Sequence, residues 1–405
     1  MRLAINAWFW NSPTGSGEYT RRLVEHLAVL APDIEILLIA PCEEKIARGK
    51  DARGKDARGR MQETLSPASC ILPPASCILP PASCILHPVS CSRSNLGKVW
   101  FEQVAFPRAC RRLKADVAHV PYWASPFFPS VPTVVTIHDL IPLLLPEYRG
   151  GPLVRLYTAL VSATARRATL VLTDSQASRR DIVAHLGLPH ERVRVVYLAA
   201  DERYTPAAAP EDDEVRARYG LPKRYVLYLG GFDVRKNVAT ALAAYHRAAP
   251  FIGEECPLVV AGQLPERDTP FTPDPRRLAR EWAVEPFVRF IGFVEEADKP
   301  ALYRGAVAFI FPSRYEGFGL PPLEALACGT PVVGSNAASL PEIVGDAGML
   351  FPPDDAHGMA TALARLVTSE NFRAELSRRA LTQAARFSWE RTARETLAAY
   401  HARRA

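Results

Sequence analysis

The feature that most limits the fold of this chain is a repeated alternation of apolar runs with amphipathic stretches. Residues 2–9 are an apolar run, residues 18–30 carry leucines at helical spacing, and residues 34–40 are a second apolar run. A strand, a helix and a strand at this spacing form a βαβ unit, whose crossover produces a parallel sheet. The chain therefore begins as an α/β domain.

The same alternation continues through most of the sequence. Residues 198–222, which are rich in Pro, Ala and acidic residues, interrupt it and are the predicted linker. Further strands are predicted at 117–120, 133–137, 170–173, 193–197, 225–229, 258–261, 288–293, 307–311, 331–334 and 348–351. Further helices are predicted at 98–114, 153–168, 175–186, 237–248 and, with Ser388 as N-cap, 389–405. Two doubly wound domains follow, at 1–205 and 206–387, and such sheets bind ligands beyond the carboxyl ends of their strands.

A segment at about residues 43–95 breaks this pattern with short repeats. Pro-Ala-Ser-Cys-Ile-Leu occurs at 67–72, 74–79 and 81–86. A proline every seven residues prevents the helix that would align the thiols, so we expect a surface loop with little fixed structure rather than a cysteine-based metal site. No Cys-x-x-Cys pair or Cys/His cluster with zinc spacing occurs, which predicts reduced thiols and no bound metal.

Charge and hydropathy narrow the class of partner. The 405 residues include 49 basic and 43 acidic ones, a net charge of +6 that suits an anionic substrate or an acidic membrane surface better than nucleic acid. The start of the chain lacks a cleavage site of the secretory type, and no apolar run is long enough to span a membrane, so we expect a cytoplasmic protein. The helix at 98–114 combines aromatic and basic residues; packing on the sheet is favoured over peripheral contact with the inner face of the membrane.

Residues 230–237, Gly-Gly-Phe-Asp-Val-Arg-Lys-Asn, directly follow a predicted strand and open a helix. Glycines such as Gly231 let the backbone approach a ligand, and a helix N-terminus attracts anions. Arg235 and Lys236 add two positive charges in the same turn, which suits a diphosphate. The alternative is a solvated turn with two surface cations; the place at the carboxyl edge of a strand favours phosphate binding.

Residues 313–324 form a second such loop and helix start. Pro321 fits the first helical position, which leaves the N–H groups of Gly319 and Leu320 directed at an anion. Glu316 lies in the loop and Glu324 about one turn into the helix, and carboxylates accept hydrogen bonds from vicinal sugar hydroxyls. One carboxylate for a transferred sugar and one for a ribose is the favoured interpretation; one capping and one surface glutamate is the alternative.

The first half offers weaker candidates. Gly15 and Gly17 lie between the first strand and the first helix, where backbone N–H groups contact phosphates, although Thr20 replaces the third glycine of a dinucleotide fingerprint. His138 follows the strand at 133–137 and is placed to bind a sugar hydroxyl or transfer a proton, whereas a lone histidine is more often structural.

Residues 316–332 strongly resemble the E-x7-E signature of glycosyltransferase family 4. Four further segments resemble motifs of the same family: 136–140, 173–175, 235–237 and 339–342. The resemblance runs nearly end to end except at 43–95. It implies a GT-B fold, with two Rossmann-like domains facing across a cleft, and metal-independent, cofactor-free sugar transfer with retention of configuration. The last helix, 388–405, then packs back on the first domain.

The resemblance also implies roles and substrates. Arg235 and Lys236 would hold the donor diphosphate and Glu324 the ribose, Glu316 and His138 would contact the donor sugar, and Gly15 to Gly17 the phosphate and acceptor side. The motifs around His138 and Ser339 are most similar to the mannosyltransferase branch, which implies GDP-mannose as donor and a glycan or lipid-linked saccharide as acceptor. One departure is residues 198–201, Leu-Ala-Ala-Asp where the family often has Asn-Gly-Val-Asp, which weakens any role for this loop.

Three other functions remain open at this point. A sugar-nucleotide epimerase of the same fold would convert the donor without an acceptor. A phosphorylase would need a lysine that carries pyridoxal phosphate. A non-catalytic sugar-nucleotide-binding partner would bind without turnover, and the presence of Glu316, Glu324, Arg235 and Lys236 argues against it.

Overall fold

The computed structural model describes residues 1–42 and 84–402, so the repeats between residues 43 and 83 lie outside it. The described residues divide into two compact units. Unit 1 contains residues 1–136 and 160–171 and the end of the last helix from Thr396, and unit 2 contains residues 137–159 and 172–395. The predicted boundary near residue 205 and the predicted packing of the last helix remain predictions.

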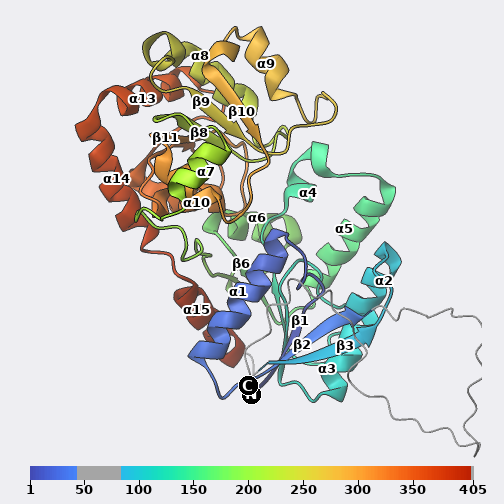
Figure 1. The fold of residues 1–405 in the computed structure, drawn as a ribbon. Helices are drawn as coiled ribbons and strands as arrows, with labels where there is room; N and C mark the ends of the chain where they lie inside the picture. Colours follow the sequence, from blue (N-terminus) through green and yellow to red (C-terminus); the bar gives the residue numbers. More distant parts are fainter. Residues whose placement is uncertain (43–83, 403–405) are drawn as a thin grey trace, which may run out of the picture. The chain divides into compact units, whose positions relative to one another are not determined.

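The first sheet has seven strands in the order β3-β2-β1-β4-β5-β6-β7. Strands β1, β2 and β3 lie side by side in Figure 1. Its strands are β1 Arg2–Asn6, β2 Glu35–Cys42, β3 Cys84–Ser90, β4 Val117–Val120, β5 Thr133–Thr136, β6 Leu170–Thr173 and β7 Val193–Val195. The helices of this part of the chain are α1 Gly15–Leu30, α2 Asn95–Trp100, η2 Phe101–Ala105, α3 Phe106–Arg112, α4 Ile141–Leu144, η3 Pro146–Tyr148, α5 Pro152–Ala165, α6 Gln176–Leu186 and η4 His190–Arg192. The apolar residues of β4 and β5 are buried on both faces, as in parallel sheets covered by helices.

The second sheet has six strands in the order β10-β9-β8-β11-β12-β13. Its strands are β8 Val226–Leu229, β9 Leu258–Ala261, β10 Val288–Gly292, β11 Ala308–Phe311, β12 Val332–Ser335 and β13 Gly348–Phe351. The helices around them are α7 Asp212–Arg218, α8 Val238–Ile252, α9 Pro275–Glu281, η5 Glu285–Phe287, α10 Lys299–Gly305, α11 Leu320–Ala327, α12 Leu340–Val344, η6 Gly345–Ala347, α13 Ala356–Thr368, α14 Glu370–Ala384 and α15 Trp389–His401.

Successive residues of β8 supply two separate cores, one on each face of the second sheet. Val226 and Tyr228 pack in one hydrophobic cluster, and Leu227 and Leu229 pack in the other. This alternation follows from the two-residue period of a strand. The sheet is therefore covered by helices on both faces, and the predicted α/β, doubly wound class is confirmed.

Both sheets reverse their strand order at one point, between β1 and β4 in the first and between β8 and β11 in the second. In open parallel sheets, ligands bind beyond the carboxyl ends of the strands at such a switch point. The loops after β8 and β11 are the two that carry Arg235, Lys236 and Glu316. The fold therefore places these residues on neighbouring loops.

The prediction of a loop throughout the segment at about 43–95 is wrong for its end, because Cys84–Ser90 form the edge strand β3. This strand pairs in parallel with β2, from Ile36↔Cys84 to Cys42↔Ser90. An edge strand can contain Pro88, because only one side of its backbone has to pair, and the pairing satisfies backbone groups of β2. Residues 84–89 are mostly apolar, but they overlap the last repeat and were therefore predicted as part of the loop.

The predictions for residues 198–222 and for residues 98–114 also need correction. The linker predicted at 198–222 contains α7, whose first turn carries Asp212, Asp213 and Glu214 as a helix N-terminus favours. The helix predicted at 98–114 is divided into α2, the π-helix η2 and α3.

The aromatic side chains of this region bear on the predicted membrane contact. Phe101 and Phe106 are fully buried, as packing on the sheet requires, whereas Trp100 remains 44% exposed. Within the described residues, no helix combines the length and hydropathy that crossing a membrane requires. Peripheral membrane contact stays a prediction.

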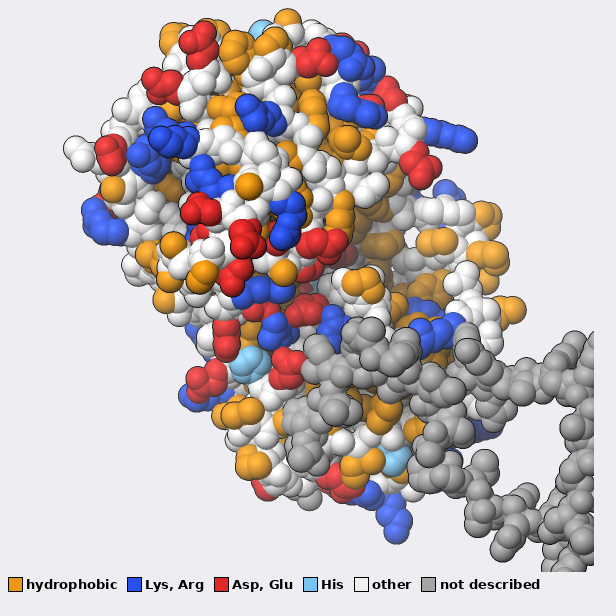
Figure 2. All heavy atoms as spheres, viewed as in Figure 1, with side chains coloured by type: hydrophobic (Ala, Val, Ile, Leu, Met, Phe, Trp, Pro, Cys, Tyr) orange, Lys and Arg blue, Asp and Glu red, His pale blue; other side chains and the backbone are white. Residues whose placement is uncertain are grey.

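Surface charges around α7 and α10 are largely paired. Figure 2 shows acidic and basic side chains interspersed over this region. Arg218 forms an ion pair with Asp298 at 2.7 Å, and Arg304 pairs with Asp212. This mixed surface agrees with the small positive excess of the sequence.

Candidate functional site

Two loops of the second sheet lie side by side and carry the charged residues that the sequence singled out. The amide N–H of Arg314 donates to the carbonyl of Arg235 at 2.8 Å, and the Ser313 hydroxyl oxygen lies 3.1 Å from the same carbonyl oxygen. The predicted arrangement, a buried strand followed by a loop and a helix, is confirmed for both: β8 leads to α8, and β11 leads to α11.

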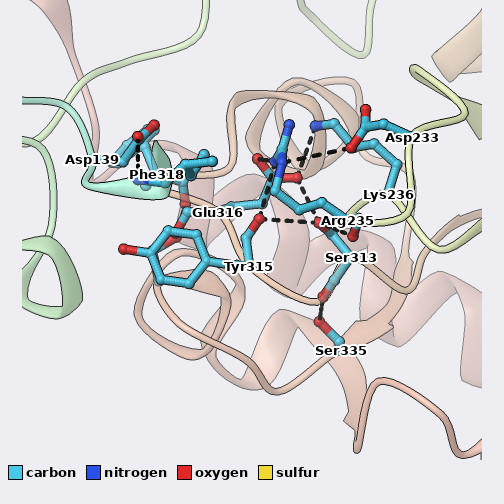
Figure 3. Close-up of polar contacts among 12 residues, drawn as sticks. Asp139, Asp233, Arg235, Lys236, Ser313, Tyr315, Glu316, Phe318 and Ser335 are labelled. Atoms are coloured by element: carbon cyan, nitrogen blue, oxygen red, sulfur yellow. Dashed lines mark hydrogen bonds and ion pairs between the residues drawn. The ribbon is translucent and has the colours of Figure 1, made fainter. Parts of the chain in front are cut away.

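The carboxylate of Glu316 lies between the two predicted phosphate-binding cations (Figure 3). Its Oε1 is 2.7 Å from the Nζ of Lys236, and its Oε2 is 2.7 Å from a terminal nitrogen of Arg235. The Ser313 hydroxyl donates to Oε1 at 2.7 Å. The structure therefore brings together three of the predicted site residues, from loops about 80 positions apart in the sequence.

This cluster is largely buried. Glu316 is 8% exposed, and the side chains of Arg235 and Lys236 are 13% and 15% exposed. Burial would raise the pKa of Glu316, but the charges of Lys236 and Arg235 and the hydrogen bonds that it accepts lower that pKa below its ordinary value. The Glu316 carboxylate holds both cationic side chains in place, and Asp233, 3.8 Å from Nε of Arg235, is a second and more distant counter-charge. Two cations fixed side by side in this way are suited to an anionic ligand.

Glu324 occupies a different environment, one turn into α11. The Tyr303 hydroxyl donates to its Oε2 at 3.1 Å, and burial raises the pKa of this carboxyl, against the opposing charge of Lys299. At the N-terminus of the helix, Gly319 has a φ of +113°, a conformation that a residue with a side chain rarely adopts. Leu320 is the first helical residue and Pro321 the second, one position later than predicted.

His138 belongs to a hydrogen-bonded group in unit 2. Its Nδ1 lies 2.6 Å from Oδ2 of Asp174, so this carboxylate orients the ring. The Ser178 hydroxyl lies within hydrogen-bond distance of the carbonyls of both His138 and Gly317, at 3.0 and 3.1 Å, and Ser175 donates to the Gly317 carbonyl at 2.6 Å. The motif at 173–175 thus links His138 to the loop that carries Glu316.

Gly317 is packed against the backbone beside His138, which gives a direct test of this link. A Cβ at position 317 would lie 2.7 Å from the His138 carbonyl oxygen and 2.9 Å from the Cβ of Asp139. Gly317→Ala is therefore expected to destabilise the protein by about 1–3 kcal/mol and to lower at least tenfold the sugar transfer that the family resemblance implies, because residues 138 and 139 must move. Denaturant unfolding and initial rates measure both effects.

Gly151→Ala is the matched control, since a Cβ there would meet nothing within 4 Å. A Gly317→Ala protein with the stability and rate of the Gly151→Ala protein would show that this contact does not matter.

Glu342, in the motif at 339–342, caps the N-terminus of α6. Its two carboxylate oxygens accept from the N–H groups of Gln176 and Ala177 at 3.0 and 3.1 Å, and the Tyr197 hydroxyl donates to it at 3.0 Å. A carboxylate at a helix N-terminus satisfies free N–H groups and interacts favourably with the helix dipole. This residue therefore fixes α6, which begins directly after Asp174 and Ser175.

Removal of this cap is expected to lower stability. Glu342→Ala should reduce the free energy of unfolding by about 2 kcal/mol, because two helix N–H groups and a phenol lose their acceptor. Glu370→Ala is the control, an exposed acid in the first turn of α14. Chemical denaturation compares the two proteins, and equal stabilities would contradict a capping role for Glu342.

The remaining predicted residues are placed as follows. Gly231 follows β8, and its carbonyl accepts from the Tyr228 hydroxyl at 2.7 Å. Gly15 begins α1 in unit 1, and Gly17 is buried, where a Cβ would lie 2.3 Å from the Ser12 carbonyl oxygen. Close packing of its own loop explains a glycine at position 17, and contact of Gly15 and Gly17 with a phosphate stays a prediction.

Sequence reasoning missed several residues that contact the predicted ones, among them Asp174, Ser313, Asp233 and Tyr148. Asp174, Ser313 and Asp233 lie inside segments already singled out and could have been considered, whereas no local pattern distinguishes Tyr148. Among the described residues, no group of three His, Cys, Asp or Glu side chains is arranged to hold a metal ion.

Comparison with known proteins places both halves of the chain in glycosyltransferase families. Residues 13–204 match the family model "Glycosyltransferase Family 4", and residues 211–383 match "Glycosyl transferases group 1". The chain is 35% identical over 268 residues to O-antigen chain mannosyltransferase B from Escherichia coli, covering 66% of this chain and 69% of that protein. It is also 35% identical to the serotype-specific mannosyltransferase WbdA from Escherichia coli over 64% of this chain, but spans 32% of WbdA.

A solved structure shows the same fold. Sucrose-phosphate synthase from Thermosynechococcus elongatus superposes with a TM-score of 0.71 at 21% identity, covering 99% of this chain and 98% of that one. With the two family matches and the two doubly wound sheets, this likeness establishes the GT-B fold. The chain belongs to glycosyltransferase family 4, in its mannosyltransferase-like branch, and is a glycosyltransferase.

Proposed function

We propose that this glycosyltransferase transfers mannose from GDP-mannose to a saccharide or lipid-linked saccharide, with retention of anomeric configuration and without a metal or other cofactor. The observation that carries the proposal is the pair of half-buried cations, Arg235 and Lys236, held by one carboxylate, Glu316. The choice of mannose is supported by the similarity to O-antigen chain mannosyltransferase B.

The catalytic step in this proposal is electrostatic. Arg235 and Lys236, together with the N-terminus of α11, stabilise the negative charge that develops on the leaving diphosphate as the glycosidic bond breaks. The acceptor hydroxyl attacks from the face that the diphosphate leaves, and a phosphate oxygen takes the hydroxyl proton. No protein nucleophile is needed, and Glu324 binds the ribose while Glu316 and His138 contact the sugar.

A donor panel tests this proposal. The full-length protein is incubated with GDP-mannose, UDP-glucose, UDP-galactose or UDP-N-acetylglucosamine and a panel of saccharide acceptors, and product is followed by release of nucleotide. We expect turnover with GDP-mannose and an α-linked mannose in the NMR spectrum of the product. Turnover with uridine donors alone, or a β-linkage, would contradict the proposal, and incubation with the donor alone controls for hydrolysis and epimerisation.

A further inference from the structure

Tyr148, at the end of η3, contacts the loop that carries the donor-binding cations. Its hydroxyl donates a hydrogen bond to Oδ1 of Asp233, two positions before Arg235. Its ring packs edge-on against Phe271, with ring centroids 5.0 Å apart, and the carbonyl of Phe271 accepts from the N–H of Val234 at 2.8 Å. Tyr148 is thus held in place on two sides next to this loop.

The short contacts of the Arg235 guanidinium with the loop after β11 are made by its NH1 group. Its terminal NH1 group donates to Glu316 and to the carbonyl of Tyr315, at 2.7 and 3.0 Å. Its Nε is buried and, among the described residues, has no hydrogen-bond partner. The carboxylate of Asp233 lies 3.8 Å from this Nε, which is too far for a hydrogen bond.

Asp233 is therefore a second carboxylate within easy reach of Arg235. A small rotation would give a charge-assisted bond from Nε to Oδ1 and place the guanidinium between two carboxylates, Glu316 and Asp233. A cation neutralised in this way would attract a diphosphate less. In the structure Oδ1 of Asp233 accepts the hydrogen bond of the Tyr148 hydroxyl, which fixes the carboxylate in an orientation that keeps this oxygen 3.8 Å from Nε, and the Tyr148 ring lies 5.9 Å from the guanidinium.

We propose that Tyr148 is a positioning residue of the donor site, whose hydroxyl holds Asp233 away from Arg235 and so keeps this cation available to the diphosphate. The proposal rests on the proposed role of Arg235 in donor binding. Burial, together with the bond to Asp233, raises the pKa of Tyr148, so the phenol keeps its proton and remains a donor at neutral pH.

Calorimetric titration of the full-length protein with GDP tests this inference. Tyr148→Phe keeps the ring but frees Asp233, and GDP affinity is expected to fall about tenfold, the scale of one hydrogen bond to a charged group. In Tyr148→Phe/Asp233→Asn the competing charge is absent, and affinity should return to within about threefold of wild type. Tyr245→Phe is the control, a buried phenol that donates to the Cys256 carbonyl at 2.8 Å in the same unit.

The double variant distinguishes a positioning role of the Tyr148 hydroxyl from a general loss of structure in Tyr148→Phe. If Tyr148→Phe binds GDP as wild type does, or if the double variant stays as weak as the single one at the same melting temperature, the inference is wrong. A parallel titration with UDP separates an error in the proposed donor from an error in the role of Tyr148. A wild-type protein that binds UDP and not GDP contradicts GDP-mannose as the donor. The affinities of Tyr148→Phe and Tyr148→Phe/Asp233→Asn are then compared with UDP as the ligand. Binding of neither nucleotide contradicts both.

Discussion

Replacing Lys236 by alanine is expected to lower sugar transfer by roughly 100- to 1000-fold, the usual cost of losing one preorganised charge at a leaving group. The ammonium lies 2.7 Å from Glu316 in a buried cluster, so its position is set before a donor arrives. In the variant, Glu316 still pairs with Arg235, and the cluster loses one of its two cations. Initial rates with saturating donor give kcat, and a titration of donor gives kcat/KM.

Two further variants make this result specific. Lys236→Arg keeps the charge and should retain more transfer than Lys236→Ala, although the planar guanidinium does not reproduce the geometry of an ammonium. Lys223→Ala removes an exposed lysine of the same unit and should transfer at the wild-type rate. A Lys236→Ala protein within threefold of the Lys223→Ala protein would exclude leaving-group stabilisation by this residue.

The fold was largely predictable because buried parallel strands leave a strong local pattern. Strands β4, β6, β9 and β13 have the predicted bounds, since each consists mainly of apolar residues. The elements that were missed have mixed local signals. In α7 the acidic first turn follows prolines and alanines, and in β3 a proline lies inside the strand. Pairing with β2 decides the structure of β3, and a local pattern does not report pairing.

The candidate site also has a part that the sequence could predict and a part that it could not. Arg235, Lys236 and Glu316 could be predicted because each lies in a loop directly after a strand, and the carboxyl ends of neighbouring parallel strands meet at one edge. The contacts that organise them join segments far apart in the chain. Tyr148 and Asp233 are 85 positions apart, and Glu342 and Gln176 are 166 apart. Sequence spacing within a motif carries no information about such pairs, so they required the structure.

Glu316→Gln is expected to separate binding of the nucleotide from transfer of the sugar. Transfer should fall roughly 1000-fold, because the amide neither carries the charge of the carboxylate nor holds both cations in the same way. GDP affinity should stay the same or rise, since GDP has no sugar and the variant presents Arg235 and Lys236 without their counter-charge. Calorimetry and initial rates measure the two quantities, and a parallel fall in both would mean that Glu316 acts only by holding the cations.

The same variant has a defined pH signature in its stability. The folded pKa of Glu316 lies below its ordinary value of 4.5, so the ionised carboxylate stabilises the folded state above that pH, and this contribution is lost as pH falls through the folded pKa. Glu316→Gln should therefore be less stable than wild type by about 3 kcal/mol at pH 7, because Lys236 and Arg235 lose the carboxylate between them, and the difference should shrink below pH 4.5.

Glu324→Gln should show the opposite trend. Burial raises the pKa of Glu324, so the ionised carboxylate destabilises the folded wild-type protein as pH rises. The stability of Glu324→Gln relative to wild type should therefore increase with pH. Denaturant titrations from pH 3.5 to about 7 decide between them, and a Glu316→Gln deficit that is independent of pH would show that the carboxylate is not stabilised by its two cations.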